Sequence, residues 1–131
     1  MGYDTHYQSY YGESVLQYFV LEGRVLLSRH RKTVQKYPNS QLILSDHVKD
    51  QLQEMRDRGR LTQGREWWFS RCLRCNAPLT KAKAEDAREN VPEYVFFQDP
   101  IRIRFCPSCG RYFWLGSHRE SMRRQLEEWG F

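Results

Sequence analysis

The residues best suited to chemistry in this 131-residue chain are its four cysteines, which form two C-x2-C pairs. Cys72 and Cys75 form the first pair, and Cys106 and Cys109 form the second, thirty residues further along. Two such pairs supply four thiolates to one zinc ion at about 2.3 Å each, and they leave no open coordination position for catalysis. The spacing therefore predicts a structural zinc site, because a tight turn aims both sulfurs of a pair at one point.

Two other chemistries use the same residue type. Disulfide bonds are typical of secreted chains, and this sequence begins without the basic start and apolar stretch of a secretory signal. An iron–sulfur cluster also takes four thiolates, but the turn and strand signals around both pairs are typical of a zinc ribbon. Because such a ribbon buries little core, we expect zinc to contribute on the order of 10 kcal/mol to its folding.

Basic residues indicate a second kind of chemistry. Lysine and arginine number 21 against 16 acidic residues, a formal net charge of +5, and most of the basic residues are arginine. The planar guanidinium binds phosphate through two hydrogen bonds and stacks on rings, which favours a nucleic-acid partner; the alternative is a solvated surface of mixed charge. The predicted RNA contacts comprise the most basic stretch and four later residues: Arg56, Arg58, Arg60, Arg65, Arg71, Arg74, Arg102, Arg104, Arg111 and His118.

Three consecutive aromatic residues, Trp67, Trp68 and Phe69, lie within this basic stretch. One interpretation is that their rings seal an interface between two small lobes. The other is that one ring stacks on an unpaired base beside the arginines. His118 has a similar pair of interpretations: with Ser117 it could hold a phosphate, or it simply occupies the first turn of a helix.

The first sixty residues contain the pattern of an α/β lobe. Apolar residues recur at helical spacing in residues 13–22 and 46–58, the second helix following Ser45 as its predicted cap. Short apolar runs at residues 24–28 and 41–44 predict strands buried on both faces. A further short strand is expected at residues 3–7. This alternation of strands and helices predicts a parallel sheet.

The second half has a different pattern. Residues 59–66 lose periodicity and form a predicted basic linker. Residues 101–105 alternate strictly, which predicts a strand with Ile101, Ile103 and Phe105 on its buried face. A second strand is expected at residues 111–115, with a turn between them. From Ser117 the capping-box spacing and the apolar spacing that follows predict a terminal helix.

Length and hydropathy limit the classes of protein. The chain suits one ordinary domain or two very small ones. Its apolar runs are far shorter than the roughly 20 residues that cross a bilayer, so we expect no membrane span and a cytoplasmic location. Its aromatic and apolar content is typical of a globular chain.

Several motifs resemble the Mut-seven C-terminal ribonuclease family. They comprise both cysteine pairs with their neighbours, Trp114 to His118, Gly2 to Thr5 and Glu22 to Arg29. The resemblance covers almost the whole chain, and it implies a PIN-like nuclease lobe joined to a zinc ribbon. In that family a cluster of carboxylates holds Mg²⁺ or Mn²⁺, which activates water for RNA hydrolysis.

This sequence departs from the family pattern at the carboxylates. The resemblance implies one aspartate on an opening strand, and that strand and its helix would precede Met1. The second acid is expected at Gly12, with Glu13 one residue away, and the third is expected where His30 stands. An internal start, a rearranged sheet or a covering partner would each account for the missing strand.

We therefore predict a truncated PIN-like parallel-sheet lobe (residues 1–58), a basic linker (59–66) and a four-cysteine zinc ribbon with a terminal helix (67–131). The predicted function is binding of RNA, such as ribosomal RNA in a ribonucleoprotein, by a catalytically degenerate member of the family. The alternative is an endoribonuclease that uses Mg²⁺ or Mn²⁺, with Glu13, Asp4 and Asp46 as substitute ligands. His30 is a further catalytic candidate, for a metal-free mechanism.

Overall fold

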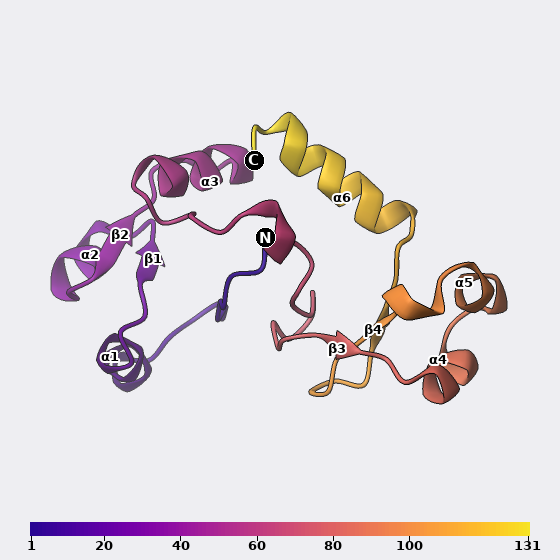
Figure 1. Cartoon of the computed structure of the whole chain (residues 1–131). Helices are drawn as coiled ribbons and strands as arrows, with labels where there is room; N and C mark the ends of the chain where they lie inside the picture. The colour runs from indigo at the N-terminus through magenta and orange to yellow at the C-terminus, as the bar shows by residue number, and fades with distance from the viewer. The chain divides into compact units, whose positions relative to one another are not determined.

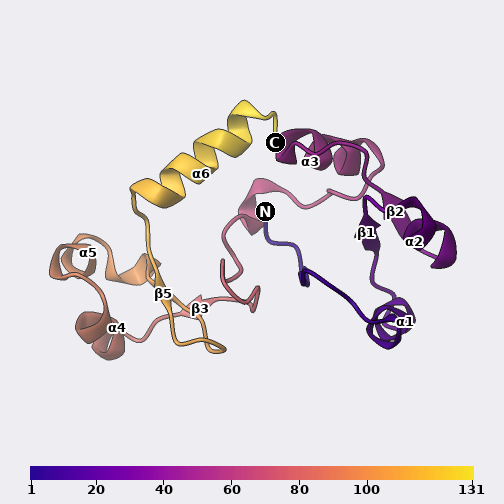
Figure 2. The same ribbon diagram turned by 180° about the vertical axis from the view of Figure 1, so that it is seen from behind.

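The computed structural model describes all 131 residues, which form two compact units. Residues 7–62 form what we call the N-terminal unit (Figure 1). Residues 63–131, together with residues 1–6, form what we call the ribbon unit, seen from the other side in Figure 2. Neither unit has a helix with the length and apolar character needed to cross a bilayer.

The N-terminal unit is built on a two-stranded parallel sheet. Its elements in chain order are α1 (Glu13–Leu21), β1 (Leu26–Ser28), α2 (Arg31–Lys36), β2 (Ser40–Leu42) and α3 (Val48–Asp57). Leu26 lies opposite Ser40 and Ser28 lies opposite Leu42, which confirms the predicted parallel pairing. Helix α2 was not predicted, because Val34 is its only apolar residue. It supplies the crossover that two parallel strands require.

The sheet is less buried than the sequence predicts. Helix α2 packs on both strands, and Gln41 and Ile43 are buried. Leu27 is nevertheless 40% exposed and Leu44 is 61% exposed. The prediction of strands buried on both faces is therefore wrong, because α2 is the one helix of this unit that packs extensively on the strands.

Helix α3 begins later than predicted. Its N-cap residue is His47, and the Ser45 hydroxyl accepts a hydrogen bond from the His47 backbone N–H at 3.1 Å, ahead of the helix. The Glu54 carboxylate reaches back from α3 and accepts hydrogen bonds from the backbone N–H groups of Leu44 (2.9 Å) and Ser45 (2.8 Å). These charge-assisted bonds attach the helix to the segment that follows β2.

These bonds predict a pH-dependent contribution of Glu54 to stability. They lower the pKa of Glu54 from its ordinary value of 4.5. A carboxyl whose pKa is lower in the folded state stabilises the fold above its unfolded pKa, and this stabilisation is lost as the pH falls through the folded pKa. We expect Glu54→Gln to be less stable than the wild type at pH 7, with the difference shrinking below about pH 4.5.

Urea unfolding of the full chain at a series of pH values, followed by the amide signals of Leu44 and Ser45, measures this difference. Glu22→Gln is the matched control, because it makes the same substitution at an exposed glutamate of the same unit, at the C-terminal end of α1. A Glu54→Gln difference that is constant from pH 7 to pH 3 would contradict the assignment.

The ribbon unit contains a three-stranded antiparallel sheet of order β3-β4-β5. Its elements are η1 (Arg65–Trp67), β3 (Thr80–Lys81), α4 (Ala84–Asn90), α5 (Glu93–Gln98), η2 (Pro100–Arg102), β4 (Arg104–Phe105), β5 (Tyr112–Phe113) and α6 (Ser117–Glu128). Helices α4 and α5 pack side by side next to η2 (Figures 1 and 2). Together with the four clustered cysteines described below, this confirms an α/β fold with a C-terminal ribbon and terminal helix.

The core of the ribbon unit lies between α4, α5 and the small sheet. Its buried members are Ala82, Ala87, Val91, Val95 and Ile103. Ile103 is fully buried, but Ile101 is 67% exposed, so the predicted shared face of residues 101–105 is wrong. The reason is local: Pro100 begins a 3₁₀ turn that the Asp99 carboxylate caps through the Arg102 N–H, so the strand begins only at Arg104.

Residues 1–6 form no strand, which corrects the short strand expected at residues 3–7. The Asn76 side-chain amide donates to the Tyr3 carbonyl at 3.1 Å and to the Thr5 hydroxyl at 2.8 Å. Gly2 has φ of +83°, and a Cβ there would meet the Trp67 carbonyl oxygen at 2.3 Å, so only glycine fits. The segment is therefore held against the first cysteine pair by specific hydrogen bonds.

Helix α6 confirms the predicted terminal helix and corrects its details. The N-cap residue is Gly116, so Ser117 is the first helical residue and not the cap. Within the helix, the Glu120 carboxylate pairs with Arg123 at 2.6 Å, and Arg123 also reaches Glu127 at 2.8 Å.

Candidate functional site

The two cysteine pairs adopt matching turns. In the first, the Asn76 N–H donates to the Cys72 carbonyl at 3.0 Å, and in the second the Gly110 N–H donates to the Cys106 carbonyl at 2.9 Å. Asn76 and Gly110 both have positive φ, of 58° and 71°. These are the conformations that asparagine and glycine tolerate best, so the residue after each pair allows the chain to turn back. The predicted turn at residues 106–110 is confirmed.

These turns bring the four sulfur atoms together. The Sγ atoms of Cys72 and Cys109 are 3.6 Å apart, and those of Cys75 and Cys106 are 3.5 Å apart. All four lie within 4.8 Å of one another as free thiols. Ligands at about 2.3 Å from a tetrahedral zinc ion are separated by about 3.8 Å. The donor set and its spacing therefore fit a structural zinc ion with no position left for substrate.

The surroundings of Cys75 and Cys109 shift the pKa values of these two thiols in opposite directions. The Ala77 backbone N–H and the Ser108 hydroxyl lower the pKa of Cys75 to about 6. Burial raises the pKa of Cys109 to about 12. A bound Zn²⁺ deprotonates a coordinating thiol outright, so four thiols of unequal acidity would all become ligands. The Arg74 backbone N–H lies 3.4 Å from the Cys72 sulfur and can stabilise its negative charge.

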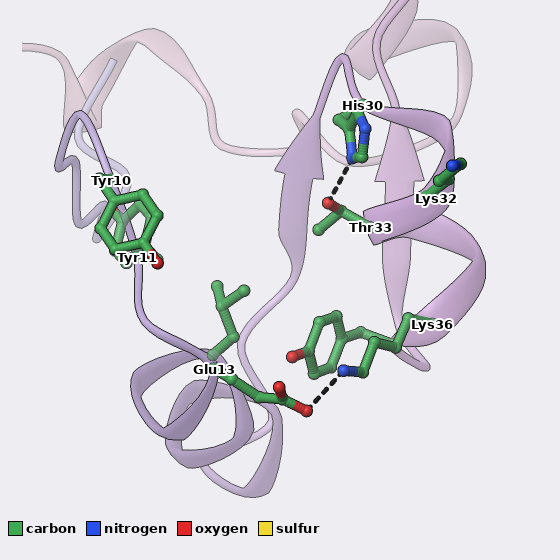
Figure 3. A pocket seen from close by; sticks show the side chains of 9 residues that line it. Tyr10, Tyr11, Glu13, His30, Lys32, Thr33 and Lys36 are labelled. Atoms are coloured by element: carbon green, nitrogen blue, oxygen red, sulfur yellow. Dashed lines mark hydrogen bonds and ion pairs between the residues drawn. The ribbon is translucent and has the colours of Figure 1, made fainter.

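The N-terminal unit has a pocket of about 260 Å³. Nine residues line it: Tyr10, Tyr11, Glu13, Leu16, His30, Lys32, Thr33, Lys36 and Tyr37. Figure 3 shows the side chains of Glu13 and Lys36 pointing at each other, and their oxygen and nitrogen atoms are 2.5 Å apart. His30 Nδ1 hydrogen bonds with the Thr33 hydroxyl at 2.8 Å. Both catalytic candidates from the sequence, Glu13 and His30, thus face one pocket.

Comparison with models of known protein families gives one match. The model of the Mut7-C RNAse domain matches residues 1–126. The chain belongs to this family. The match confirms the resemblance carried by the cysteine pairs and the N-terminal motifs. Comparisons with curated proteins and with solved structures found no significant match.

The three carboxylates predicted as substitute metal ligands in this Mut7-C domain each lie next to a basic residue. Glu13 pairs with Lys36, whose pKa is raised chiefly by that hydrogen bond, so the ammonium stays protonated. Asp4 lies in the ribbon unit, 3.6 Å from the Arg71 guanidinium. Asp46 lies 3.6 Å from the ring of its neighbour His47. Each carboxylate thus faces a basic group, and within each unit only the four cysteines are gathered closely enough to hold a metal ion.

Several predicted RNA-contact arginines have local partners in the Mut7-C domain. Arg56 donates to Gln53 at 2.7 Å and Arg58 donates to the Leu42 carbonyl at 3.2 Å, both in the N-terminal unit. In the ribbon unit, Arg71 donates to the Gly2 carbonyl at 3.1 Å and Arg65 donates to the Phe131 carbonyl. These hydrogen bonds give the four arginines a structural role in the fold.

Four further candidates lie on the surface. Arg60 belongs to the N-terminal unit, and Arg74, Arg111 and His118 belong to the ribbon unit. All four are exposed, and their side chains make no ion pair. Trp68 of the aromatic triplet is buried, with the Arg65 guanidinium over its ring.

Arg119 was not among the residues predicted from the sequence to contact RNA, but the structure places it beside the aromatic triplet. The Arg119 guanidinium, on α6, lies 4.7 Å from the centre of the Phe69 ring. Its pKa is lowered by burial and by the positive charges of neighbours that include Arg102 and Arg104. The positive charges of Arg102 and Arg104 therefore act on Arg119, which itself lies beside an aromatic ring. Only packing of α6 against residue 69 reveals this, since nothing in the local sequence of Arg119 distinguishes it.

Proposed function

We propose that this Mut7-C domain binds RNA through its ribbon unit, with zinc as a structural support and without metal-dependent hydrolysis. The supporting observations are the Arg119 guanidinium over the Phe69 ring and the positive charges of Arg102 and Arg104, which act on Arg119. We call these four residues the arginine patch. Membership of a ribonuclease family makes RNA the polyanion of choice among possible partners.

The charges of the patch favour a phosphate ligand. Arg104 and Arg119 form no ion pair, whereas the Arg102 guanidinium lies 3.1 Å from the Asp99 carboxylate. Arg119 is partly buried, and its pKa is lowered in part by Arg102 and Arg104. Such repulsion between like charges is relieved when a phosphate binds between them, because the anion attracts each guanidinium. The adjoining Phe69 ring provides an aromatic surface of the kind on which unpaired bases stack.

The groups around Glu13 support the loss of hydrolysis. PIN-type chemistry needs several carboxylate oxygens around a hard divalent cation. In the pocket of the N-terminal unit, Glu13 is the only acidic residue, and the Lys36 ammonium lies 2.5 Å from its carboxylate. A protonated lysine at that distance repels a divalent cation. The second candidate function, a Mg²⁺- or Mn²⁺-dependent endoribonuclease, is favoured by the family and by the shared position of Glu13 and His30.

Structured RNA within a ribonucleoprotein, such as a ribosome, is the proposed partner. Its loops present unpaired bases next to closely spaced phosphates, which suits arginines beside a ring. Cosedimentation of the protein with ribosomal particles, lost in variants of the patch, would support this finer assignment.

The proposal is tested by RNA affinity at several salt concentrations. We expect log K to fall linearly with log salt, because each phosphate contact releases a counterion. In Arg104→Gln/Arg119→Gln the slope should decrease by about 2, one for each lost phosphate contact. Arg56→Gln/Arg58→Gln is the matched control, since these arginines also number two and lie in the N-terminal unit, outside the patch.

Equal losses in both double variants, or a flat salt dependence in the wild type, would contradict RNA binding by the arginine patch. The same preparations, incubated with RNA in Mn²⁺ or in EDTA, test hydrolysis. We expect no cleavage that depends on Mn²⁺. Cleavage that is lost in Glu13→Gln would establish the endoribonuclease function instead.

A further inference from the structure

The pocket of the N-terminal unit is distinct from both the zinc site and the arginine patch. Its charged residues are Glu13, Lys32 and Lys36, and His30 adds an imidazole. Since Lys36 already pairs with Glu13, the charge that remains is that of Lys32. The formal balance is one positive charge, so the pocket suits an anion better than a cation.

Hydrogen-bonding groups surround this charge. The His30 ring is exposed and uses Nδ1 with the Thr33 hydroxyl, which leaves Nε2 available for a ligand. Tyr10, Tyr11 and Tyr37 also line the pocket, and each carries a phenol hydroxyl. Imidazole, ammonium and phenol groups all donate hydrogen bonds, and phosphate oxygens accept them.

The opposite side of the pocket is aromatic. Figure 3 shows Tyr10 and Tyr11 across the pocket from His30, Thr33 and Lys36. Tyr11 is held edge-on against Phe19 of α1, with ring centres 6.1 Å apart. Tyr10 is 76% exposed and so presents a ring face to solvent. An exposed aromatic ring across from basic residues provides the two kinds of contact that a nucleotide uses, base stacking and phosphate binding.

We infer that this pocket binds a nucleotide without a metal ion, with its phosphate toward Lys36, Lys32 and His30 and its base toward the tyrosines. The ligand is a nucleoside monophosphate or the phosphorylated end of an RNA strand. No covalent step is involved. Glu13 then does not bind a metal ion. Its negative charge offsets the positive charge of Lys36 and so weakens phosphate binding. The inference does not depend on RNA binding by the arginine patch.

Titration of the full, zinc-loaded chain with adenosine 5′-monophosphate, followed by amide chemical shifts, tests this inference. We expect shifts at residues 10–16 and 30–37, weaker binding of inorganic phosphate and still weaker binding of adenosine. A 5′-phosphorylated oligoribonucleotide distinguishes the two sources: tighter binding of it than of the mononucleotide, at the same residues, identifies an RNA end.

The direction in which nucleotide affinity changes when Glu13 is replaced distinguishes an anion-binding pocket from a cation-binding one. Glu13→Gln should tighten nucleotide binding about two- to five-fold, because it removes an exposed negative charge next to Lys36. Lys36→Met should weaken it about ten-fold, through loss of a charge-assisted hydrogen bond. Lys49→Met, in α3 and outside the pocket, should have no effect. All three side chains are exposed, so each variant is expected to fold.

Two results would overturn the inference. One is broadening of the same amide signals by Mn²⁺ that is abolished by Glu13→Gln, which would make the pocket a cation site. The other is the absence of shifts at these residues in millimolar nucleotide. Neither depends on the salt dependence measured with the arginine-patch variants, so failure of this inference and failure of RNA binding are distinguished.

Discussion

Replacing Cys106 with serine is expected to unfold the ribbon unit and to abolish binding of one equivalent of zinc. Cys106 is fully buried, and its sulfur lies 3.5 Å from that of Cys75. A serine hydroxyl is not deprotonated near neutral pH and replaces a thiolate poorly as a zinc ligand. Because the unit buries few residues, loss of metal binding removes a contribution on the order of 10 kcal/mol.

Zinc content and amide spectra of the purified full-length variant measure this effect. Wild-type protein treated with a strong chelator should show the same loss of dispersed signals from residues 63–131. Ser108→Ala is the matched control: it lies in the same turn and removes one hydrogen bond to Cys75, but it leaves all four thiols. We expect it to retain one equivalent of zinc. A folded Cys106→Ser protein, or unchanged melting after chelation, would refute the structural role of the metal.

Replacing Ile103 with alanine is expected to destabilise the ribbon unit by about 2–5 kcal/mol. Ile103 is fully buried among residues of α4, α5 and the sheet, including Ala87, Val91 and Val95. Truncation removes buried methyl groups and leaves a cavity that this small core fills only in part. We expect zinc to hold the adjoining cysteine turns, and therefore a folded but less stable zinc-bound protein.

Ile101→Ala is the matched control, because it is the same substitution two residues away at a side chain that is 67% exposed. Its effect on the free energy of unfolding should stay within about 0.5 kcal/mol, as is usual for surface positions. Denaturant unfolding in excess zinc compares the two variants. Similar losses of stability in both would contradict the 3₁₀ turn at Pro100 and would restore the alternating strand predicted for residues 101–105.

Features whose physical cause is local could be predicted from the sequence. The clustering of the four cysteines is of this kind, since a C-x2-C spacing followed by Asn76 or Gly110 makes the same turn in both pairs. The parallel pairing of β1 and β2 and the terminal helix also follow from periodicity within short segments. The family was indicated by the same local motifs, and the match over residues 1–126 confirms it.

Predictions failed where two local signals competed. Alternation over residues 101–105 predicts a strand, but Pro100 and the capping carboxylate of Asp99 impose a turn that exposes Ile101. Ser45 has the residue type of a helix cap, yet its hydroxyl accepts a hydrogen bond from the His47 N–H, ahead of α3. The Glu54 carboxylate accepts hydrogen bonds from the N–H groups of Leu44 and Ser45. A single residue pattern does not state which of two available hydrogen-bond partners is chosen.

The sequence by itself determined the four cysteines of the metal-binding cluster, the family and the excess of basic residues. Only the tertiary structure decided which basic residues remain available: Arg71 is engaged by Gly2, Lys36 by Glu13, and Arg119 comes to lie over Phe69. The physical reason is that these partners are far apart along the chain. Their contacts depend on how whole elements pack, and an ion pair or ring contact forms only after that packing has brought the groups together.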